Sequence, residues 1–169
     1  MNKYGNLEAF LHTFNPDYQQ QICADVDVCY FGDFPTLSKL RAGYGTTAAA
    51  TWLVPQLYNL SEYCGCRDKL QGNPLKECAF VISTEFHYLK VSELMLFFHR
   101  FKAGRYGRFY GAVDPLIITE SLRAFCKERW LAYDEREQQI REQQEAEHRK
   151  TAITHEQYLK LKKEKETDK

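Results

Sequence analysis

The sequence LMLFFHRFKAGRYGRFYGAV, residues 94–113, contains a helical pattern and the point at which that pattern stops. Its first half has the apolar spacing of a buried helix face, at Leu94, Phe97, Phe98 and Phe101. Gly104 is suited to end this helix, because glycine adopts the left-handed conformation of helix C-termini without steric cost. The stretch therefore predicts a helix with its apolar face in the core, followed by a glycine-rich turn.

Helical patterns also precede this stretch. Thr46 or Thr47 suits the start of a helix that Gly65 ends, and Pro74 suits the first turn of the next one. The apolar stripe of that second helix is formed by Leu75, Cys78, Ala79, Ile82, Phe86 and Leu89. Ser92 is expected to cap the helix of the opening stretch. Residues 26–31 alternate apolar and polar side chains in part, which favours a short strand or an extended segment.

After the turn, Asp114-Pro115 has the pattern of an N-cap and a first-turn proline, so a long helix should begin at about Pro115 or Thr119. Its apolar positions in the domain are Ile118, Leu122, Phe125, Cys126 and Tyr133. The sequence thus predicts a mostly α-helical fold, with a compact multi-helix domain over residues 1–133.

The composition changes abruptly after Tyr133, because residues 134–150 contain only Ile140 and Ala146 as aliphatic residues. Residues 134–169 are therefore expected to form a projecting, charged helical C-terminal arm. Its acidic and basic residues are spaced for favourable pairs, Glu137 with Arg141 and Glu145 with Arg149, each contributing about 0.2–0.5 kcal/mol. A capping-box pattern at Thr154 predicts a last helix.

Positive charge is concentrated around the turn. The whole chain has a formal net charge of +0, but residues 90–133 contain eight Lys or Arg and four Asp or Glu. The cations and rings expected to contact nucleic acid are Arg100, Lys102, Arg105, Tyr106, Arg108, Phe109 and Tyr110. Cations neutralise phosphates and rings stack on bases, provided that both face outward together. In the alternative interpretation, the arginines reach carboxylates such as Asp114 or Glu120, and the turn is purely structural.

The sequence contains few residues spaced for metal binding or catalysis. Cys64 and Cys66 with Cys78 and His87 could bind zinc, but the C-x-C spacing is not the usual C-x2-C of zinc sites. Glu85 and His87 lack a spacing that requires a catalytic arrangement. We therefore expect no cofactor, no metal and no enzymatic activity. No run reaches the length of a membrane span and no secretory signal is visible, so a cytoplasmic protein with reduced thiols is expected.

The sequence resembles an uncharacterised family of small proteins from Bacteroidota and their phages and conjugative elements. The similar segments are Phe34-Pro35-Thr36-Leu37, Tyr44-Gly45, WLVPQL at residues 52–57 and SELMLFFHRFKAGRYGRFYGAVDPLIIT at residues 92–119. The general form is also similar to phage replication accessory proteins of the helicase-loader type. These resemblances imply a partner that is DNA or a replisome protein, and they assign no residues.

Two functions follow as hypotheses. The first is a non-enzymatic, DNA-associated accessory protein of a mobile element, acting through the basic turn. The second is a protein–protein adaptor that docks a partner, or a second copy in a homo-oligomer, through the C-terminal arm. The arm lacks the sustained apolar heptads of a coiled coil.

Overall fold

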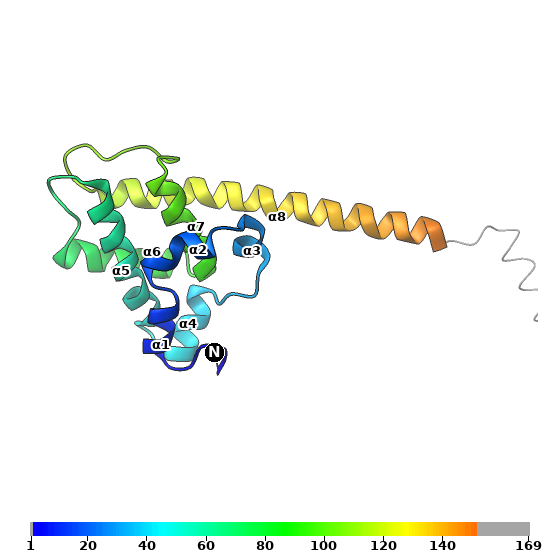
Figure 1. Cartoon of the computed structure of the whole chain (residues 1–169), viewed down its shortest axis with the longest axis horizontal. Helices are drawn as coiled ribbons and strands as arrows, with labels where there is room; N and C mark the ends of the chain where they lie inside the picture. The colour runs from blue at the N-terminus through cyan, green and yellow to red at the C-terminus, as the bar shows by residue number, and fades with distance from the viewer. Residues whose placement is uncertain (1, 152–169) are drawn as a thin grey trace, which may run out of the picture. The chain divides into compact units, whose positions relative to one another are not determined.

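The computed structural model describes residues 2–151, which form helices joined by turns and contain no strand (Figure 1). The helices are η1 (Asn2–Tyr4), α1 (Leu7–Thr13), η2 (Pro16–Tyr18), α2 (Gln19–Ile22), α3 (Val26–Phe31), α4 (Leu37–Tyr44), α5 (Ala48–Cys64), α6 (Gly72–Glu85), α7 (Val91–Lys102) and α8 (Pro115–Thr151). The chain divides into two compact units between Arg129 and Trp130. The predicted mostly α-helical fold is confirmed.

Helix α7 is the centre of the first unit. All its residues from Val91 to Phe98 are buried, and so is Phe101. The ring of Phe97 lies 5.5 Å from that of Tyr106 and 5.8 Å from that of Phe125, measured between centroids. The predicted buried face of this helix is therefore confirmed, and it joins the turn to α8.

Two local predictions are wrong. Residues 26–31 form helix α3, because the Asp25 carboxylate accepts hydrogen bonds from the backbone N–H groups of Asp27 and Val28 and caps it. Ser92 does not cap α7, which begins one residue earlier. Its hydroxyl donates instead to the buried carbonyl of Cys29 (2.7 Å) and fastens α3 to α7.

The loop between α5 and α6 pairs with the turn between α7 and α8. Asp68 N donates to the carbonyl of Gly111 (3.1 Å), and Val113 N donates to the carbonyl of Asp68 (2.9 Å). Figure 1 shows both loops at the same end of the unit. Residues separated by about forty positions in the sequence therefore share one surface.

Helix α8 begins at Pro115, the first of the two predicted starts, and the Asp114 carboxylate accepts a hydrogen bond from Leu116 N (2.8 Å). Ile118, Leu122 and Phe125 are buried in the first unit. In the second unit, both predicted pairs of the arm are present, Glu137–Arg141 and Glu145–Arg149, each at 3.4 Å. The helix expected from Thr154 lies outside the described residues. Within residues 2–151, no helix has the length and apolarity needed to cross a bilayer.

Candidate functional site

The four cations of the turn separate into two pairs with different surroundings. Arg100 Nη1 donates to Glu128 Oε2 (2.8 Å) and to Tyr30 Oη (2.8 Å), and Arg105 Nε donates to Glu128 Oε1 (3.1 Å). The carboxylate that binds both is therefore Glu128 of α8, and not Asp114 or Glu120. The expectation that all four cations face outward together is wrong for Arg100, whose side chain is 16% exposed against Glu128, whereas Arg105 binds the same acid and stays 54% exposed.

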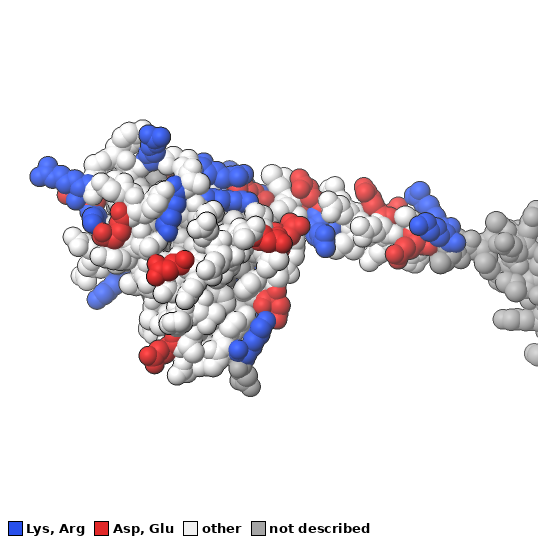
Figure 2. Space-filling view, viewed as in Figure 1, with Lys and Arg blue, Asp and Glu red and all other residues white. Residues whose placement is uncertain are grey.

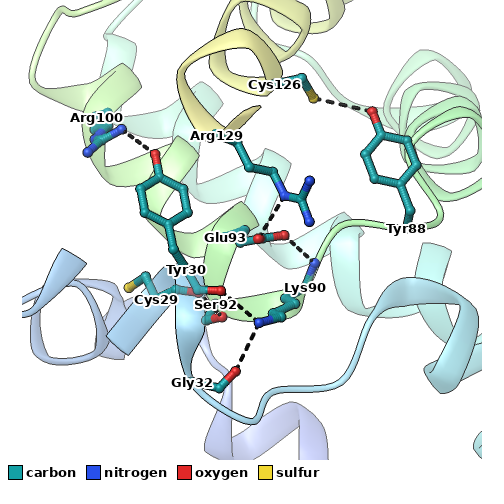
Figure 3. Close-up of polar contacts among 10 residues, drawn as sticks. All are labelled: Cys29, Tyr30, Gly32, Tyr88, Lys90, Ser92, Glu93, Arg100, Cys126 and Arg129. Carbon is teal, nitrogen blue, oxygen red and sulfur yellow. Dashed lines mark hydrogen bonds and ion pairs between the residues drawn. The ribbon is translucent and has the colours of Figure 1, made fainter. Parts of the chain in front are cut away.

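Glu128 belongs to a wider polar network that fixes α7 against α8. Figure 3 shows the part of this network around Glu93 and Arg129. Arg129, the neighbour of Glu128, donates to Glu93 Oε1 (2.8 Å), and the Glu93 side chain is fully buried. The second oxygen of Glu93 accepts a hydrogen bond from Lys90 N (2.8 Å). Two ion pairs of opposite polarity thus join the helices, since α7 provides the acid in one and the base in the other.

The same region contains further structural contacts. The Lys90 ammonium donates to the carbonyls of Tyr30 (2.7 Å) and Gly32 (3.1 Å), as Figure 3 shows. The Tyr88 hydroxyl donates to Cys126 Sγ (3.5 Å), and burial raises the pKa of Tyr88 to about 12. These contacts join neighbouring helices and loops, so we infer that the cluster stabilises the fold and does not bind a ligand.

The aromatic residues of the turn also differ in accessibility. Tyr106 is half-buried against Phe97, its hydroxyl donates to Glu128 (3.4 Å), and burial raises its pKa. Phe109 stacks on Phe101 with centroids 5.2 Å apart. Tyr110, in contrast, is 89% exposed. Of the three rings predicted to meet a ligand, only Tyr110 is fully presented to solvent.

The second cation pair, Lys102 and Arg108, lines a hollow of about 320 Å³ in the first unit. The other lining residues are Tyr63, Cys64, Phe101, Ala103, Gly104, Gly107 and Phe109. Three of these have no side chain beyond a methyl group, so backbone is exposed at the wall. Gly104 and Gly107 have φ angles of 81° and 101°, which favour glycine. We call this feature the Lys102 hollow.

Lys102 is half-buried and is held by amides rather than by acids. Its ammonium donates to Gln19 Oε1 (2.7 Å) and to Asn59 Oδ1, and it lies 5.8 Å from the centroid of the Tyr63 ring. Within residues 2–151, neither Lys102 nor Arg108 takes part in an ion pair. Burial lowers the pKa of Lys102 and outweighs the opposing charge of Asp17, which forms no ion pair with the ammonium.

The amides that hold Lys102 are themselves fixed. Gln19 is buried and donates to Gln56 Oε1 (2.7 Å), and Gln56 donates to the carbonyl of Phe14 (2.8 Å). Because these amides satisfy one another, Gln19 presents its oxygen to the ammonium. Since an ammonium has three donors and the amides take two, Lys102 keeps one N–H for a ligand.

Sequence reasoning missed two residues of this surface, Tyr63 and Arg67. Tyr63 is an exposed residue in the last turn of α5. Arg67 is exposed next to Asp68, whose backbone pairs with the turn. Figure 2 shows several Lys and Arg side chains at the end of the unit where these loops lie. The segment YCGCR, residues 63–67, resembles the turn in composition, but its backbone pairing with residues 111–113 has no signal in the sequence.

Neither a metal site nor a catalytic cluster is assembled from the predicted candidates. The described residues contain no group of three His, Cys, Asp or Glu able to hold a metal ion, and the six cysteines are free thiols. His87 Nδ1 lies 3.0 Å from Ser38 Oγ. Burial raises the pKa of Cys78 to about 11, which makes its thiol a poor nucleophile at neutral pH.

Comparison with known proteins gives a family without an assigned role. No curated protein and no solved structure matches the chain. A family model matches residues 69–169, which include α6, α7, the turn and α8. The matched region contains Lys102 and Arg108, whereas Tyr63 and Arg67 precede it. Because the match covers more than half of the chain, the protein belongs to the family of unknown function DUF6633.

Proposed function

We propose that this protein binds nucleic acid, without catalysis, at the Lys102 hollow and the turn beside it. The observation that carries the proposal is the charge of Lys102, which is half-buried and has no ion-pair partner among the described residues. The Asp17 carboxylate raises the pKa of Lys102 through space but forms no ion pair with it, so a half-buried ammonium without a contacting acid can still attract an anion, because water and counter-ions screen it less than a surface lysine. Arg108, exposed on the same hollow, provides a second unpaired charge.

The surroundings of the hollow favour a polyanion over a small anion. Arg67 and Tyr110 are exposed on the two loops that pair beside it, so charge and an aromatic ring extend beyond the hollow itself. Interleaved cations and rings are typical of surfaces that follow a nucleic-acid backbone and stack on bases. The net charge of the chain is zero, so the contact is local.

The residues proposed at the contact are Arg67, Lys102, Arg105, Arg108, Phe109 and Tyr110. Arg105 is included because its side chain is 54% exposed and binds Glu128 through Nε, which leaves its terminal nitrogens for a phosphate. Arg100 and Tyr106 are more deeply placed, and we propose that they support the turn from beneath.

The proposal is tested with Arg67→Ala and Arg108→Ala combined. Fluorescence anisotropy at low salt should show weaker binding to single- and double-stranded DNA, and the slope of log K against log salt should fall by about one for each phosphate that the variant no longer neutralises. Arg123→Ala is the matched control, since Arg123 is an exposed arginine of α8 that does not line the hollow. Unchanged binding by the double variant would remove the proposal.

More specifically, we propose that the protein is a cytoplasmic, DNA-associated accessory protein of a mobile element and that it acts as a helicase loader. The support for this role is the resemblance of residues 92–119 to the uncharacterised mobile-element family, the similarity of the general form to helicase-loader proteins, and the basic hollow. The genomic neighbourhood tests it. An adjacent helicase or primase gene whose product binds this protein supports a replication role, and a nuclease or toxin gene there contradicts it.

A second candidate function, partner docking by the second unit, is favoured by one observation. Trp130, Leu131 and Ile140 of α8 are exposed, with Trp130 at 64%. Exposed tryptophan is uncommon on a surface that meets only water, and it is a frequent anchor of protein interfaces. In this alternative the arm binds a replisome protein or a second copy of the chain.

The adaptor alternative predicts that Trp130→Ala abolishes binding to the product of the adjacent gene, or shifts the sedimentation of the whole chain from oligomer to monomer. Gln138→Ala, on the same unit, is the control. A variant that keeps its partners and its oligomeric state contradicts this candidate.

A further inference from the structure

We infer that the Lys102 hollow binds one nucleotide of a single strand, with a phosphate between Lys102 and Arg108 and the adjoining base on the ring of Tyr63. This inference rests on the proposed function and makes it specific. It concerns the form of the nucleic acid, single-stranded against duplex, and it adds Tyr63 of α5 as a binding residue.

The phosphate position follows from the two cations. Lys102 has one N–H left by its amide partners, and the exposed guanidinium of Arg108 can donate two parallel hydrogen bonds. Ala103, Gly104 and Gly107 line the same hollow, and an added Cβ at either glycine would meet no atom within 4 Å. The backbone there is open to a ligand, so a phosphate can approach both charges.

The base position follows from Tyr63. Its side chain is 63% exposed although it lines the hollow, and the Lys102 ammonium lies 5.8 Å from its ring centroid. A phosphate bound at Lys102 therefore lies beside this ring. Phe109 stacks on Phe101, so one of its faces is already covered. Tyr63 is the lining ring most available to stack on a base.

The size of the hollow favours a single strand. A volume of about 320 Å³ is at the lower end of small-molecule sites, which suits one nucleotide. In a duplex, each base is paired and stacked inside the helix, so its face cannot reach Tyr63 unless the nucleotide is flipped out at an unfavourable free energy. An unpaired strand presents phosphate and base together.

The test compares labelled oligonucleotides of about 12 nucleotides, as single-stranded DNA, single-stranded RNA of the same sequence and blunt duplex. The wild-type protein should bind the single strand roughly tenfold more tightly than the duplex, because only the single strand gains base stacking. Tyr63→Ala should weaken single-strand binding about 5- to 150-fold and leave duplex binding unchanged. Tyr63→Phe should retain the wild-type affinity, since a ring remains.

The matched control is Tyr58→Ala, which removes an exposed tyrosine of the same helix outside the hollow and should change neither affinity. Lys102→Met and Arg108→Gln should each weaken single-strand binding at low salt. Arg108→Gln keeps the test valid if Lys102→Met fails to fold, because Arg108 is exposed. The DNA and RNA arms show which sugar the site prefers, and tighter binding of either single strand supports the inference.

Three outcomes overturn the inference. If duplex and single strand bind equally and Tyr63→Ala weakens neither, the proposed function stands but the nucleotide site is wrong. If inorganic phosphate displaces the oligonucleotide at concentrations equal to those of a mononucleotide, the hollow is an anion site without base recognition. If no nucleic acid binds at low salt, the inference and the proposed function both fail.

Discussion

The two cation pairs of the turn have the same charge and opposite surroundings. Arg100 and Arg105 converge on Glu128, whereas Lys102 and Arg108 line a hollow and have no ion-pair partner among the described residues. The basic stretch is therefore two surfaces rather than one. The first pair binds Glu128 and supports the packing of α7 against α8, although Arg105 stays 54% exposed, and the second pair lines the hollow.

Helix geometry explains the separation. Arg100 and Lys102 are two residues apart on α7, so their side chains point about 200° apart around the helix axis. Arg100 faces α8, which provides Glu128, while Lys102 faces α2 and α5, which provide the amides of Gln19 and Asn59. The chemistry of the facing helices decides which cation is neutralised.

The largest effect should come from Glu128→Gln. Arg100 would lose its neutralising partner in a largely buried position, and the free energy of unfolding should fall by about 3 kcal/mol. Nucleic-acid binding should persist, because Glu128 does not line the hollow. Urea denaturation measures the first quantity and anisotropy measures the second.

Glu120→Gln is the control for this change. Glu120 is an exposed acid of the same helix, and its substitution should alter stability by less than about 0.5 kcal/mol. If Glu128→Gln destabilises the protein no more than Glu120→Gln does, the contrast between the two cation pairs has no energetic basis.

A smaller effect is expected from Asn59→Asp, which gives Lys102 the carboxylate that it lacks. The new ion pair should weaken single-strand binding by roughly tenfold, about 1.4 kcal/mol, through loss of net positive charge in the hollow. Stability should stay the same or rise, because a half-buried charge gains a partner. Asn59→Ser, which adds no charge, should weaken binding much less, and equal losses in both variants would contradict the role of charge.

The sequence contains most of the information for the fold but only part of that for the site. The period of Leu94, Phe97, Phe98 and Phe101 is a local property, and so are the cap of Asp114 and the left-handed Gly104, which is why these predictions are confirmed. Residues 26–31 differ from the prediction because a capping carboxylate at Asp25 outweighs the alternation of apolar side chains.

The partition of the cations could not be predicted, since it depends on contacts between distant residues. Glu128 lies 28 residues after Arg100, and Asn59 lies 43 residues before Lys102. Helix periodicity shows that Arg100 and Lys102 point in different directions, but it does not show which helix each one meets. The position of Tyr63 at the hollow also depends on contacts between distant residues, because only packing brings the end of α5 beside the turn.

Arg105→Ala should have a smaller effect still. This arginine is more than half exposed, so its pair with Glu128 contributes less than about 1 kcal/mol, and Arg100 remains to neutralise the carboxylate. Binding should weaken less than with Arg108→Ala, which removes a charge from the hollow itself. Thermal unfolding and anisotropy on the two single variants give the comparison. A larger binding loss for Arg105→Ala than for Arg108→Ala would mean that nucleic acid binds near Arg105 and not at the Lys102 hollow.

The smallest effect concerns pH and the lowered pKa of Lys102. Between this lowered pKa and the ordinary value of 10.5, the unfolded chain holds a proton on Lys102 that the folded protein has released, so folding stability should rise with pH. Phosphate binding requires the same proton, so affinity should fall a few-fold over the same range. Asp17, Cys64 and Cys23 also act electrostatically on Lys102, and burial raises the pKa of the Cys64 thiol. Urea denaturation and fluorescence anisotropy at several pH values test this in the wild type and in Lys102→Met. If stability rises and affinity falls with pH only in the wild type, the effect belongs to Lys102. If affinity falls equally in Lys102→Met, other groups cause it.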